Sequence, residues 1–504
     1  MNKPNILVIC SDEHHPHLTS YGGHPYVKTP NLDRLAGRGT NFGRAYCNSP
    51  VCTPSRMSFI TGKYVNQIDN WFIGIPLDRK EITWPKRLQQ AGIPSTMLGK
   101  MDFCGEYQDG GFGDYKIIEK RGAYETYPRR SPLLSRLSGY VRADKREHIM
   151  HSGIRKDVVT DGRNGHDDEL GFYDHDRIVT EWACDYIRDK SDKKAEGPWA
   201  LYVGLLYPHW PYTVPKKYFD MYYSDKIEFP YDFKVPFHPA LHPEVANFQR
   251  AQNLTNLTDE DIKRTLAAYY GMVSCMDERI GRILLELEQG GLMENTCVIY
   301  TSDHGESLGE HGLFYKQCSY EGSVGVPLVM AGPGIPKGIV IKEPVSLVDM
   351  YPTIMDIAGL ETEKDRPGIS WRKIARGEVP APDIVFSEYH GNFFRKDWYM
   401  LCDSEYKYTF YVGDRPTLFY VRQDPMEMND LALDPAYQSV LAKYEAYLRN
   451  IVDPEAVSMR SKADLGLISP EGEDYTVNLS VQEVEAGYKT GRFEFEPEVP
   501  TPLV

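Results

Sequence analysis

The sequence of 504 residues lacks an excess of positive charge. Its 57 lysines and arginines are outnumbered by 72 aspartates and glutamates, and the formal net charge at pH 7 is −15. Proteins that bind nucleic acid cluster lysine and arginine against the phosphates, so we expect no nucleic-acid partner. The negative charge also repels small anions. An anionic substrate would therefore have to be attracted by a local group of cations or by a metal ion.

Long apolar runs are also missing, and no segment stays apolar over the length that crosses a bilayer. The composition, with 41% hydrophobic and 26% charged residues, is typical of a globular protein, so we expect no membrane contact. Residues 1–4 lead directly into the apolar run Asn5–Cys10, without a separate apolar segment and cleavage site. We expect this run to be a first strand instead of a signal peptide, and the protein to be cytoplasmic.

Cysteine pairs of the C-x-x-C type do not occur, and the number of cysteines, nine, is odd. This pattern favours reduced, mostly buried thiols.

No internal repeat is present. The length exceeds the size at which a single core stops growing, which predicts one large domain and at least one smaller one.

Apolar runs of strand type alternate with helical patterns along most of the chain. Such alternation is typical of a parallel sheet that helices cover on both faces. We predict an α/β fold with a large, mostly parallel sheet sandwiched by helices. The strands expected in it are 5–10, 199–206 and 297–300, and the helices are 30–38, 53–61 and 262–289.

The pattern changes beyond about residue 380 to short runs rich in aromatic residues, as in an antiparallel meander. We predict a large domain over 1–379, with a loop-rich insertion at about 122–176. A small C-terminal α+β subdomain over 380–470 would contain an antiparallel sheet and a helix near 437–451. The polar stretch 471–504 would form an arm, and a homo-oligomer in which this arm reaches a neighbouring subunit is left open.

Polar side chains follow three of the predicted strands. Asp12 and Glu13 come after the first, His209 after the second, and Asp303 and His304 after the third. Ligands of open α/β sheets bind outside the carboxyl ends of the strands, so we expect these side chains to converge. Two acids at the ends of two strands favour a metal site.

The run Cys-Thr-Pro-Ser-Arg at residues 52–56 matches the signal that sulfatase-maturing enzymes read when they oxidise a cysteine to an aldehyde. Together with its neighbouring motifs, the chain resembles a type I, formylglycine-dependent sulfatase of the alkaline phosphatase superfamily, with local similarity to the choline sulfatase branch around Gly99–Gly105. The motifs of this resemblance, in chain order, are Ser11-Asp12-Glu13, Thr29-Pro30-Asn31-Leu32-Asp33-Arg34-Leu35, Cys52–Arg56, Gly99-Lys100, Pro208-His209-Trp210-Pro211-Tyr212, Ser302-Asp303-His304-Gly305 with Lys316, and the segment 418–431.

The resemblance implies a sulfuric ester hydrolase, arylsulfatase-like, that cleaves an alkyl, aryl or carbohydrate sulfate monoester. Its nucleophile would be the hydrate of formylglycine (3-oxoalanine) derived from Cys52, which the maturing enzyme, as a partner, would produce. One divalent cation, Ca²⁺ before Mg²⁺ or Mn²⁺, would lower the pKa of that hydrate. The ligands implied are Asp12, Glu13, Cys52, Asp303 and His304.

The same resemblance assigns catalytic roles to cations and to one histidine. Arg56, Lys100 and Lys316 would hold the hydrate and the sulfate oxygens, and His209 would be the acid towards the leaving oxygen. Asp102 stands where many sulfatases have a histidine that helps to release sulfate, and is a candidate base. Among residues outside these motifs, His390 is a candidate for substrate binding, as are His166, Asp174 and His175.

Two further functions remain open at this stage. A phosphonate monoester or phosphodiester hydrolase would use the same aldehyde, because phosphoryl and sulfuryl oxygens need similar cationic contacts. A non-catalytic protein that binds sulfate esters would leave its cysteine unconverted, and only Asp102 favours it.

Overall fold

The computed structural model describes residues 3–118, 171–193, 197–224, 242–252, 254, 257–390, 394, 396–465, 467 and 468. Most of the predicted insertion, His166 included, and all of the predicted arm 471–504 lie outside these residues. The last residues of the predicted insertion are described, and they begin a long helix at Phe172 instead of ending a loop.

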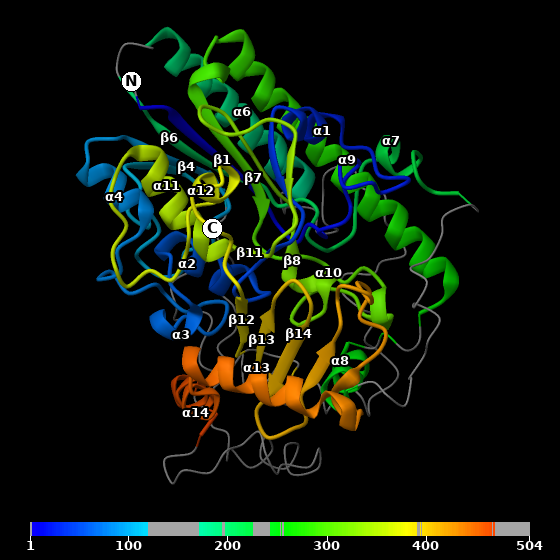
Figure 1. Ribbon diagram of the computed structural model, residues 1–504. Coiled ribbons are helices and arrows are strands. Elements are labelled where there is room, and N and C mark those ends of the chain that lie inside the picture. The colour runs from blue at the N-terminus through cyan, green and yellow to red at the C-terminus, as the bar shows by residue number, and fades with distance from the viewer. Residues whose placement is uncertain are drawn as a thin grey trace, which may run out of the picture.

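An eight-stranded sheet forms the centre of the large domain (Figure 1). Five neighbouring strands run parallel to one another, and an antiparallel strand and a further pair extend the sheet at one edge. The large, mostly parallel sheet of the prediction is thereby confirmed. In spatial order the strands are β10 (Ile339–Ile341), β2 (Gly39–Phe42), β9 (Leu328–Ala331), β7 (Thr296–Ser302), β1 (Asn5–Ser11), β6 (Ala200–Gly204), β4 (Ser95–Gly99) and β5 (Asp114–Lys116).

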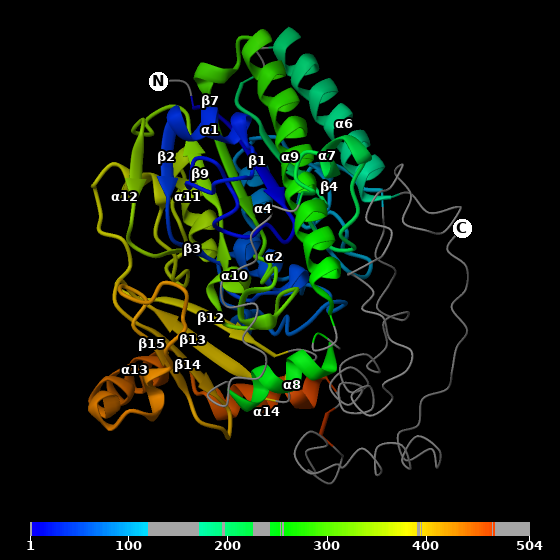
Figure 2. The same ribbon diagram turned by 90° about the vertical axis from the view of Figure 1, so that its right-hand side faces the viewer.

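The central strands are apolar along their whole length because helices cover both faces of the sheet. Every residue of β1 and of β7 is buried, as expected for strands without a solvent face. Figure 2 shows the two helical layers. One contains α1 (Pro30–Gly37), α6 (Phe172–Asp192), α7 (Lys216–Phe219) and α9 (Asp259–Gln289), and the other α2 (Cys52–Thr61), α4 (Trp84–Gln90), α11 (Met350–Ala358) and α12 (Trp371–Ala375).

The longest helix, α9, illustrates how local sequence sets these boundaries. Thr258 and Asp261 form a reciprocal capping box at its start, and the chain leaves the helix at Gly290. The remaining short elements are α3 (Val65–Ile68), α8 (Pro243–Ala251) and α10 (Glu321–Val324), with a small sheet of β3 (Ala45–Tyr46), β8 (Gly325–Val326) and β11 (Val345–Ser346).

The C-terminal part is an antiparallel four-stranded sheet, which confirms the predicted meander. Its strands are β12 (Val385–Tyr389), β13 (Trp398–Cys402), β14 (Lys407–Tyr411) and β15 (Thr417–Phe419). Two helices follow it, α13 (Gln438–Ile451), close to the range predicted for it, and α14 (Pro454–Asp464). None of the helices in the described ranges has both the length and the apolarity required to cross a membrane.

Four parallel neighbours, β7, β1, β6 and β4, bring their carboxyl ends to one edge of the sheet. In register, Ser11 lies beside Ser302, and Gly204 lies beside Gly99. The ends of β4 and β6 approach so closely that a Cβ on Gly204 would lie 1.9 Å from the Lys100 carbonyl oxygen. Only glycine allows this approach, and it brings the segments after β4 and β6 close together.

Candidate active site

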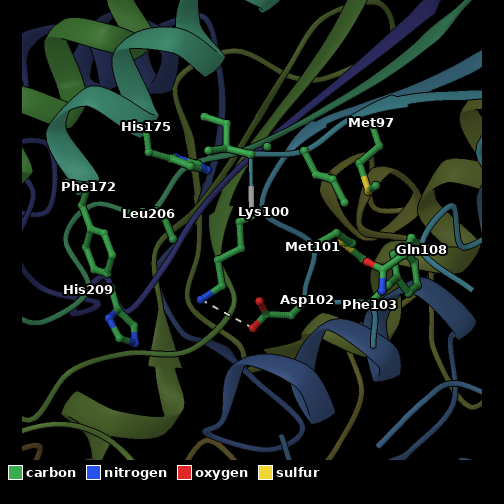
Figure 3. Close-up of a pocket in the computed structure, with 13 residues that line it drawn as sticks. Met97, Lys100, Met101, Asp102, Phe103, Gln108, Phe172, His175, Leu206 and His209 are labelled. Atoms are coloured by element: carbon green, nitrogen blue, oxygen red, sulfur yellow. Dashed lines mark ion pairs between the residues drawn. The ribbon is translucent and has the colours of Figure 1, made fainter. Parts of the chain in front are cut away.

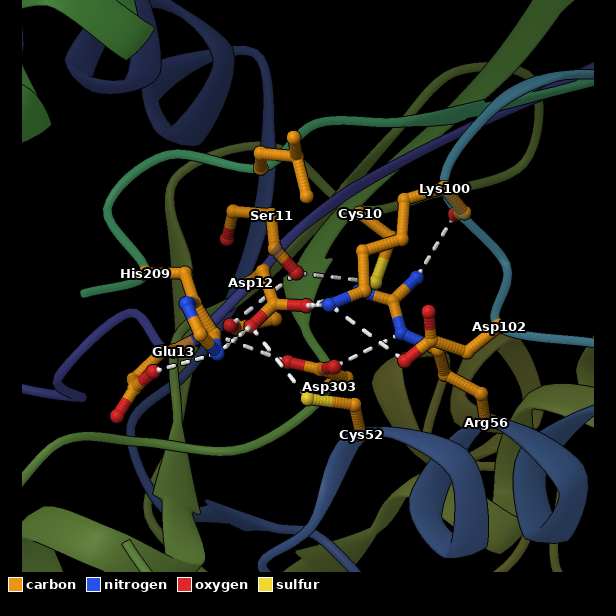
Figure 4. A network of polar contacts seen from close by, with 12 residues as sticks. Cys10, Ser11, Asp12, Glu13, Cys52, Arg56, Lys100, Asp102, His209 and Asp303 are labelled. Atoms are coloured by element: carbon orange, nitrogen blue, oxygen red, sulfur yellow. Dashed lines mark hydrogen bonds and ion pairs between the residues drawn. The ribbon is translucent and has the colours of Figure 1, made fainter. Parts of the chain in front are cut away.

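The polar residues that follow these four strands converge, as the sequence predicts (Figure 4). Asp12 follows β1, Asp303 follows β7, Lys100 follows β4, and His209 lies in the segment after β6. Each comes from a different strand, so the site exists only once the sheet has formed. This edge is where open α/β sheets bind ligands.

Cys52 is the first residue of α2, and its side chain points towards Asp12 and His304. Val51 precedes it in extended conformation, and no side chain caps the helix. The Cys52 Sγ lies 3.7 Å from Asp12 Oδ1 and 3.3 Å from His304 Nε2, and the residue is 1% exposed. The predicted position of Cys52 at a helix N-terminus, where backbone N–H groups favour an anion, is confirmed.

An unmodified thiol at this position is a poor nucleophile. Burial raises the pKa of the Cys52 thiol, and the charge of Asp12 raises it further, against the opposing effect of Lys100 and Lys316. The thiol therefore stays protonated at neutral pH, whereas reactive cysteines have a lowered pKa. This environment argues against a thiolate nucleophile at Cys52.

Arg56 lies behind the two aspartates and holds them in place. Its Nη2 donates to Asp12 Oδ2 at 3.0 Å and its Nε to Asp303 Oδ2 at 2.8 Å. Its Nη1 donates to the Lys100 carbonyl and to the Tyr202 hydroxyl. The side chain is 0% exposed, so Arg56 acts on the site by orienting carboxylates.

The atoms left facing Cys52 suit a divalent cation. Arg56 donates hydrogen bonds to the Oδ2 atoms of Asp12 and Asp303. The Oδ1 atoms of these aspartates lie 4.0 and 3.7 Å, respectively, from His304 Nε2. One ligand atom from each of these residues and from Cys52 falls within 4.8 Å of the others. His304 Nδ1 lies 2.9 Å from the Gly305 carbonyl oxygen, which must accept its hydrogen, so Nε2 offers its lone pair. The donor set fits Ca²⁺, Mg²⁺ or Mn²⁺.

The charge state of Asp12 agrees with this role. Burial alone would raise the pKa of its carboxyl, but the charges of Lys100 and Arg56 outweigh burial and hold the pKa well below its usual range. Asp12 is thus an anion at neutral pH. A buried anion of this kind is retained when cations surround it.

Glu13 lies differently from its predicted place among the ligands. Its Oε2 is 2.6 Å from Lys316 Nζ and 3.3 Å from His209 Nε2. Asp12, Glu13 and His209 do form a second group of closely spaced ligand atoms. Lys316, however, donates a hydrogen bond to the Glu13 carboxyl, so the structure pairs Glu13 with a lysine and leaves it outside the group around Cys52.

Lys316 and His209 form a hydrogen-bonded pair in the same group of residues. Lys316 Nζ lies 2.8 Å from His209 Nε2, and an ammonium group can only donate, so Nε2 accepts. The other ring nitrogen, Nδ1, faces the Trp210 carbonyl and carries the hydrogen. Burial and the charge of Lys316 hold the pKa of His209 well below its usual range. In this arrangement His209 is neutral, and the proton beside the site is on Lys316.

Lys316 itself remains protonated. Burial alone would lower its pKa, but the Glu13 carboxylate outweighs burial and raises the pKa. Lys100 lies on the opposite side, with Nζ 2.6 Å from Asp12 Oδ2 and 3.5 Å from Asp102 Oδ2. The two ammonium groups supply the local positive charge that an anionic substrate requires in a protein of net negative charge.

A cavity leads from this group of residues (Figure 3). Lys100, Asp102 and His209 line it together with apolar side chains. His175, a candidate for substrate binding from the sequence, lines it too. Phe172, a residue the sequence reasoning missed, belongs to the same wall, with its ring centroid 5.8 Å from that of His209.

His390 does not have the position expected of a substrate-binding residue. It is fully buried, with Nε2 2.8 Å from Glu388 and Nδ1 3.3 Å from Asp397. Each ring nitrogen is therefore hydrogen-bonded to a carboxylate of the small sheet or its loops. Asp174, another candidate, forms an ion pair with Arg177 at the surface of α6.

Glu306 is a further residue that the sequence reasoning missed. Its Oε1 accepts hydrogen bonds from the backbone N–H groups of Leu308 and Tyr315 at 2.8 and 2.6 Å. Its Oε2 accepts from the Tyr212 hydroxyl at 2.8 Å. This buried carboxyl thus joins the segment that carries Lys316 to the one that carries His209. Its place directly after Asp-His-Gly was the signal available in the sequence.

Known proteins are similar in sequence to this chain over most of its length. A family model described as sulfatase matches residues 4–360, and one described as N-sulphoglucosamine sulphohydrolase, C-terminal, matches residues 309–453. Arylsulfatase K of Bos taurus is 30% identical over 484 residues, which cover 90% of this chain and 83% of that protein. Choline-sulfatase of Rhizobium meliloti (strain 1021) is 30% identical over 441 residues, covering 86% and 83%.

Solved structures share the fold at lower identity. The phosphonate monoester hydrolase of Agrobacterium radiobacter aligns with a TM-score of 0.70 at 22% identity, over 93% of this chain and 99% of that chain. A protein solved with its substrate D-glucosamine-2-N,6-O-disulfate aligns with a TM-score of 0.68 at 21% identity, over 92% and 98%. These likenesses support the predicted fold class.

Proposed function

Because the chain belongs to the sulfatase family and is a sulfuric ester hydrolase, we propose that it cleaves a sulfate monoester of an alkyl, aryl or carbohydrate alcohol, with Cys52 as the residue that carries the nucleophile. The observation that carries this proposal is the position of Cys52. Its Sγ lies at a helix N-terminus against Asp12 and His304, in surroundings that keep an unmodified thiol protonated.

Two groups would complete the site. When Cys52 is oxidised to formylglycine and a divalent cation is bound by Asp12, Asp303 and His304, the hydrated aldehyde can lose a proton near neutral pH and act as an oxygen nucleophile. The residues themselves supply the rest. Arg56 keeps the carboxylates in position, as such sites require.

The lysines would bind the sulfate and the paired histidine would face the leaving oxygen. Lys100 contacts Asp12, and Lys316 contacts Glu13. The positive charges of the two lysines would stabilise the sulfate oxygens on which negative charge develops. The proton for the leaving alcohol would start on Lys316 and pass directly or through His209, because the resting His209 Nε2 is an acceptor. His209 remains our choice for the residue in contact with the leaving oxygen.

The conversion of Cys52 can be tested together with catalysis. We would express the chain with and without a sulfatase-maturing enzyme, measure the mass of the peptide that contains Cys52, and assay 4-nitrophenyl sulfate. We expect turnover only in the sample that carries the aldehyde. Cys52→Ala should abolish turnover, and Cys184→Ala, a buried cysteine of α6 outside the site, should retain it. Full turnover by Cys52→Ala, or by a sample that contains only thiol, would refute the proposal.

A phosphonate monoester or phosphodiester hydrolase that uses the same converted cysteine is the alternative. The lysine pair does not distinguish phosphoryl from sulfuryl oxygens, because both present similar anionic oxygens. We would compare kcat/KM for 4-nitrophenyl sulfate with that for a 4-nitrophenyl phosphonate monoester. A clear preference for the phosphonate would favour the alternative.

The partner and the compartment also remain proposals. A sulfatase-maturing enzyme is the partner that the converted cysteine requires. A cytoplasmic location is supported by the state of the cysteines, since all nine are free and buried, as expected of a protein from a reducing compartment. Fractionation of the host cells would test the location.

A further inference from the structure

His175 is a polar side chain of the cavity that has no part in the chemistry proposed above. It lies near the start of α6, is 3% exposed, and lines the same cavity as Lys100 and His209. Figure 3 shows it on the α6 side of the cavity, with Phe172 from the same helix and Leu206 nearby. The ring is therefore placed beside the path that a leaving group would take.

The neighbouring carboxylate fixes the orientation of this ring. Asp176 Oδ1 lies 2.9 Å from His175 Nδ1. The same carboxylate accepts hydrogen bonds from the backbone N–H groups of Leu206 at 2.7 Å and Tyr207 at 2.9 Å. Since an ionised carboxylate only accepts, Nδ1 carries the hydrogen. His175 Nε2 is then an acceptor, and it has no hydrogen-bond partner among the residues that the structure describes.

Asp176 connects this ring to the reacting part of the site. The two N–H groups that it accepts belong to the segment that leads from β6 to His209. Asp176 is 1% exposed, so these hydrogen bonds are shielded from water and hold their geometry. One carboxylate thus sets the distance between the His175 ring and the segment that faces the leaving oxygen.

We propose that His175 is a specificity-determining residue, whose Nε2 accepts a hydrogen bond from a hydroxyl group of the leaving alcohol. The preferred substrates would then be sulfate esters of polyols or sugars, or of aromatic alcohols with a second hydroxyl. The inference rests on the proposed sulfate-ester hydrolysis. Lys100 and His209 mark the end of the cavity where the ester bond breaks, and Phe172 and Leu206 offer apolar contact to the carbon skeleton.

The physical basis is the cost of an unused acceptor. When a substrate without the hydroxyl fills the cavity, it displaces water from Nε2 and leaves this nitrogen without a partner. Sites that hydrogen-bond a substrate hydroxyl reject analogues that lack it much more strongly than apolar sites reject a missing methylene. His175 would therefore change the ratio of kcat/KM between substrates with and without the hydroxyl, and would not take part in the chemical step.

Two chromogenic probes that differ by one hydroxyl test this inference. 4-Nitrocatechol sulfate has a hydroxyl beside the ester, and 4-nitrophenyl sulfate lacks it. We expect His175→Leu to lower kcat/KM for the first by about tenfold, the worth of one hydrogen bond to a buried acceptor, mostly through KM. The same change should not lower kcat/KM for the second probe, because the variant has no acceptor that this probe would leave without a partner. His175→Gln, which retains an acceptor, should restore most of the preference.

The outcomes separate a specific contact from a merely structural residue. Equal losses with both probes, or no loss with either, would overturn the role of His175, as would failure of His175→Gln to restore the preference over His175→Leu. If the wild-type protein with converted Cys52 hydrolyses neither probe, the proposed function fails, and this inference with it. Turnover of both probes with an unchanged ratio in His175→Leu would overturn the inference alone.

Discussion

Replacement of His390 should weaken the attachment of the C-terminal sheet in a pH-dependent way. The imidazole lies between Glu388 Oε2 and Asp397 Oδ2. Glu388 also accepts hydrogen bonds from the backbone and the side chain of Asn66 in α3 of the large domain, and Asp397 accepts one from Ser461 of α14. Burial alone would lower the pKa of His390, but the two carboxylates outweigh it and raise the pKa to about 9.

The sign and size of the effect follow from this pKa. The unfolded state has the ordinary value of 6.5, so the folded state binds the proton more tightly. The resulting stabilisation is complete below pH 6.5, declines as the pH rises, and is lost above about pH 9. The difference between the two values, at 1.36 kcal/mol per pH unit, corresponds to about 3 kcal/mol. His390→Gln, which leaves two buried carboxylates without a cation, should cost a similar amount, about 3–5 kcal/mol, at pH 6.

Urea unfolding followed by tryptophan fluorescence at pH 6, 7.5 and 9.5 would measure this contribution. We expect the wild-type midpoint to fall over this range, and the decline to be much smaller in His390→Gln. His242→Gln is the matched control, because His242 is also buried against the C-terminal sheet, but burial lowers its pKa to about 4. Parallel pH profiles for the wild type and His390→Gln would refute the reasoning. A large rise in KM for His390→Gln at pH 7 would revive the substrate-binding hypothesis.

Three further predictions concern the site. Asp303→Asn should lower the affinity for a divalent cation at least about tenfold, because it removes a charged ligand atom; calcium titration followed by calorimetry would show it, and unchanged affinity would exclude Asp303 as a ligand. Lys316→Met should lower kcat for an aryl sulfate by about 10²–10³, as expected for the loss of a charge that faces a developing anion, in steady-state assays of fully converted protein; a loss below about threefold would contradict its role. Glu306→Ala should expose the Leu308 and Tyr315 amides to faster hydrogen exchange, because it removes the oxygen that accepts from both N–H groups; unchanged exchange would show that Glu306 does not hold this segment.

Much of the fold could be read from local patterns. The apolar run at Asn5–Cys10 and the one at 297–300 became the central strands β1 and β7, because a strand with helices on both faces must be apolar throughout. The helical period at 262–289 became α9. The helix α6 was not predicted, because the residues before Phe172 carry no clear period and its first residues were assigned to the loop-rich insertion.

The candidate site was only partly predictable. Motif order indicated Asp12, Cys52 and Asp303, and the topology of parallel strands made their convergence an expectation. The partners of the charged side chains could not be derived in this way. Glu13 was expected to be a metal ligand, yet its carboxylate meets Lys316, which is 303 positions away in the chain.

The sequence by itself determined the α/β architecture, the position of Cys52 as the candidate nucleophile and the acids that follow the first and third predicted strands, because periodicity and short motifs are local properties. Only the tertiary structure decided which cation each buried carboxylate meets. It placed Arg56 behind the aspartates, left His209 neutral beside Lys316, and enclosed His390 between two acids. The reason is that the charge state and role of a buried group depend on neighbours within a few ångströms, and in this protein those neighbours come from distant strands.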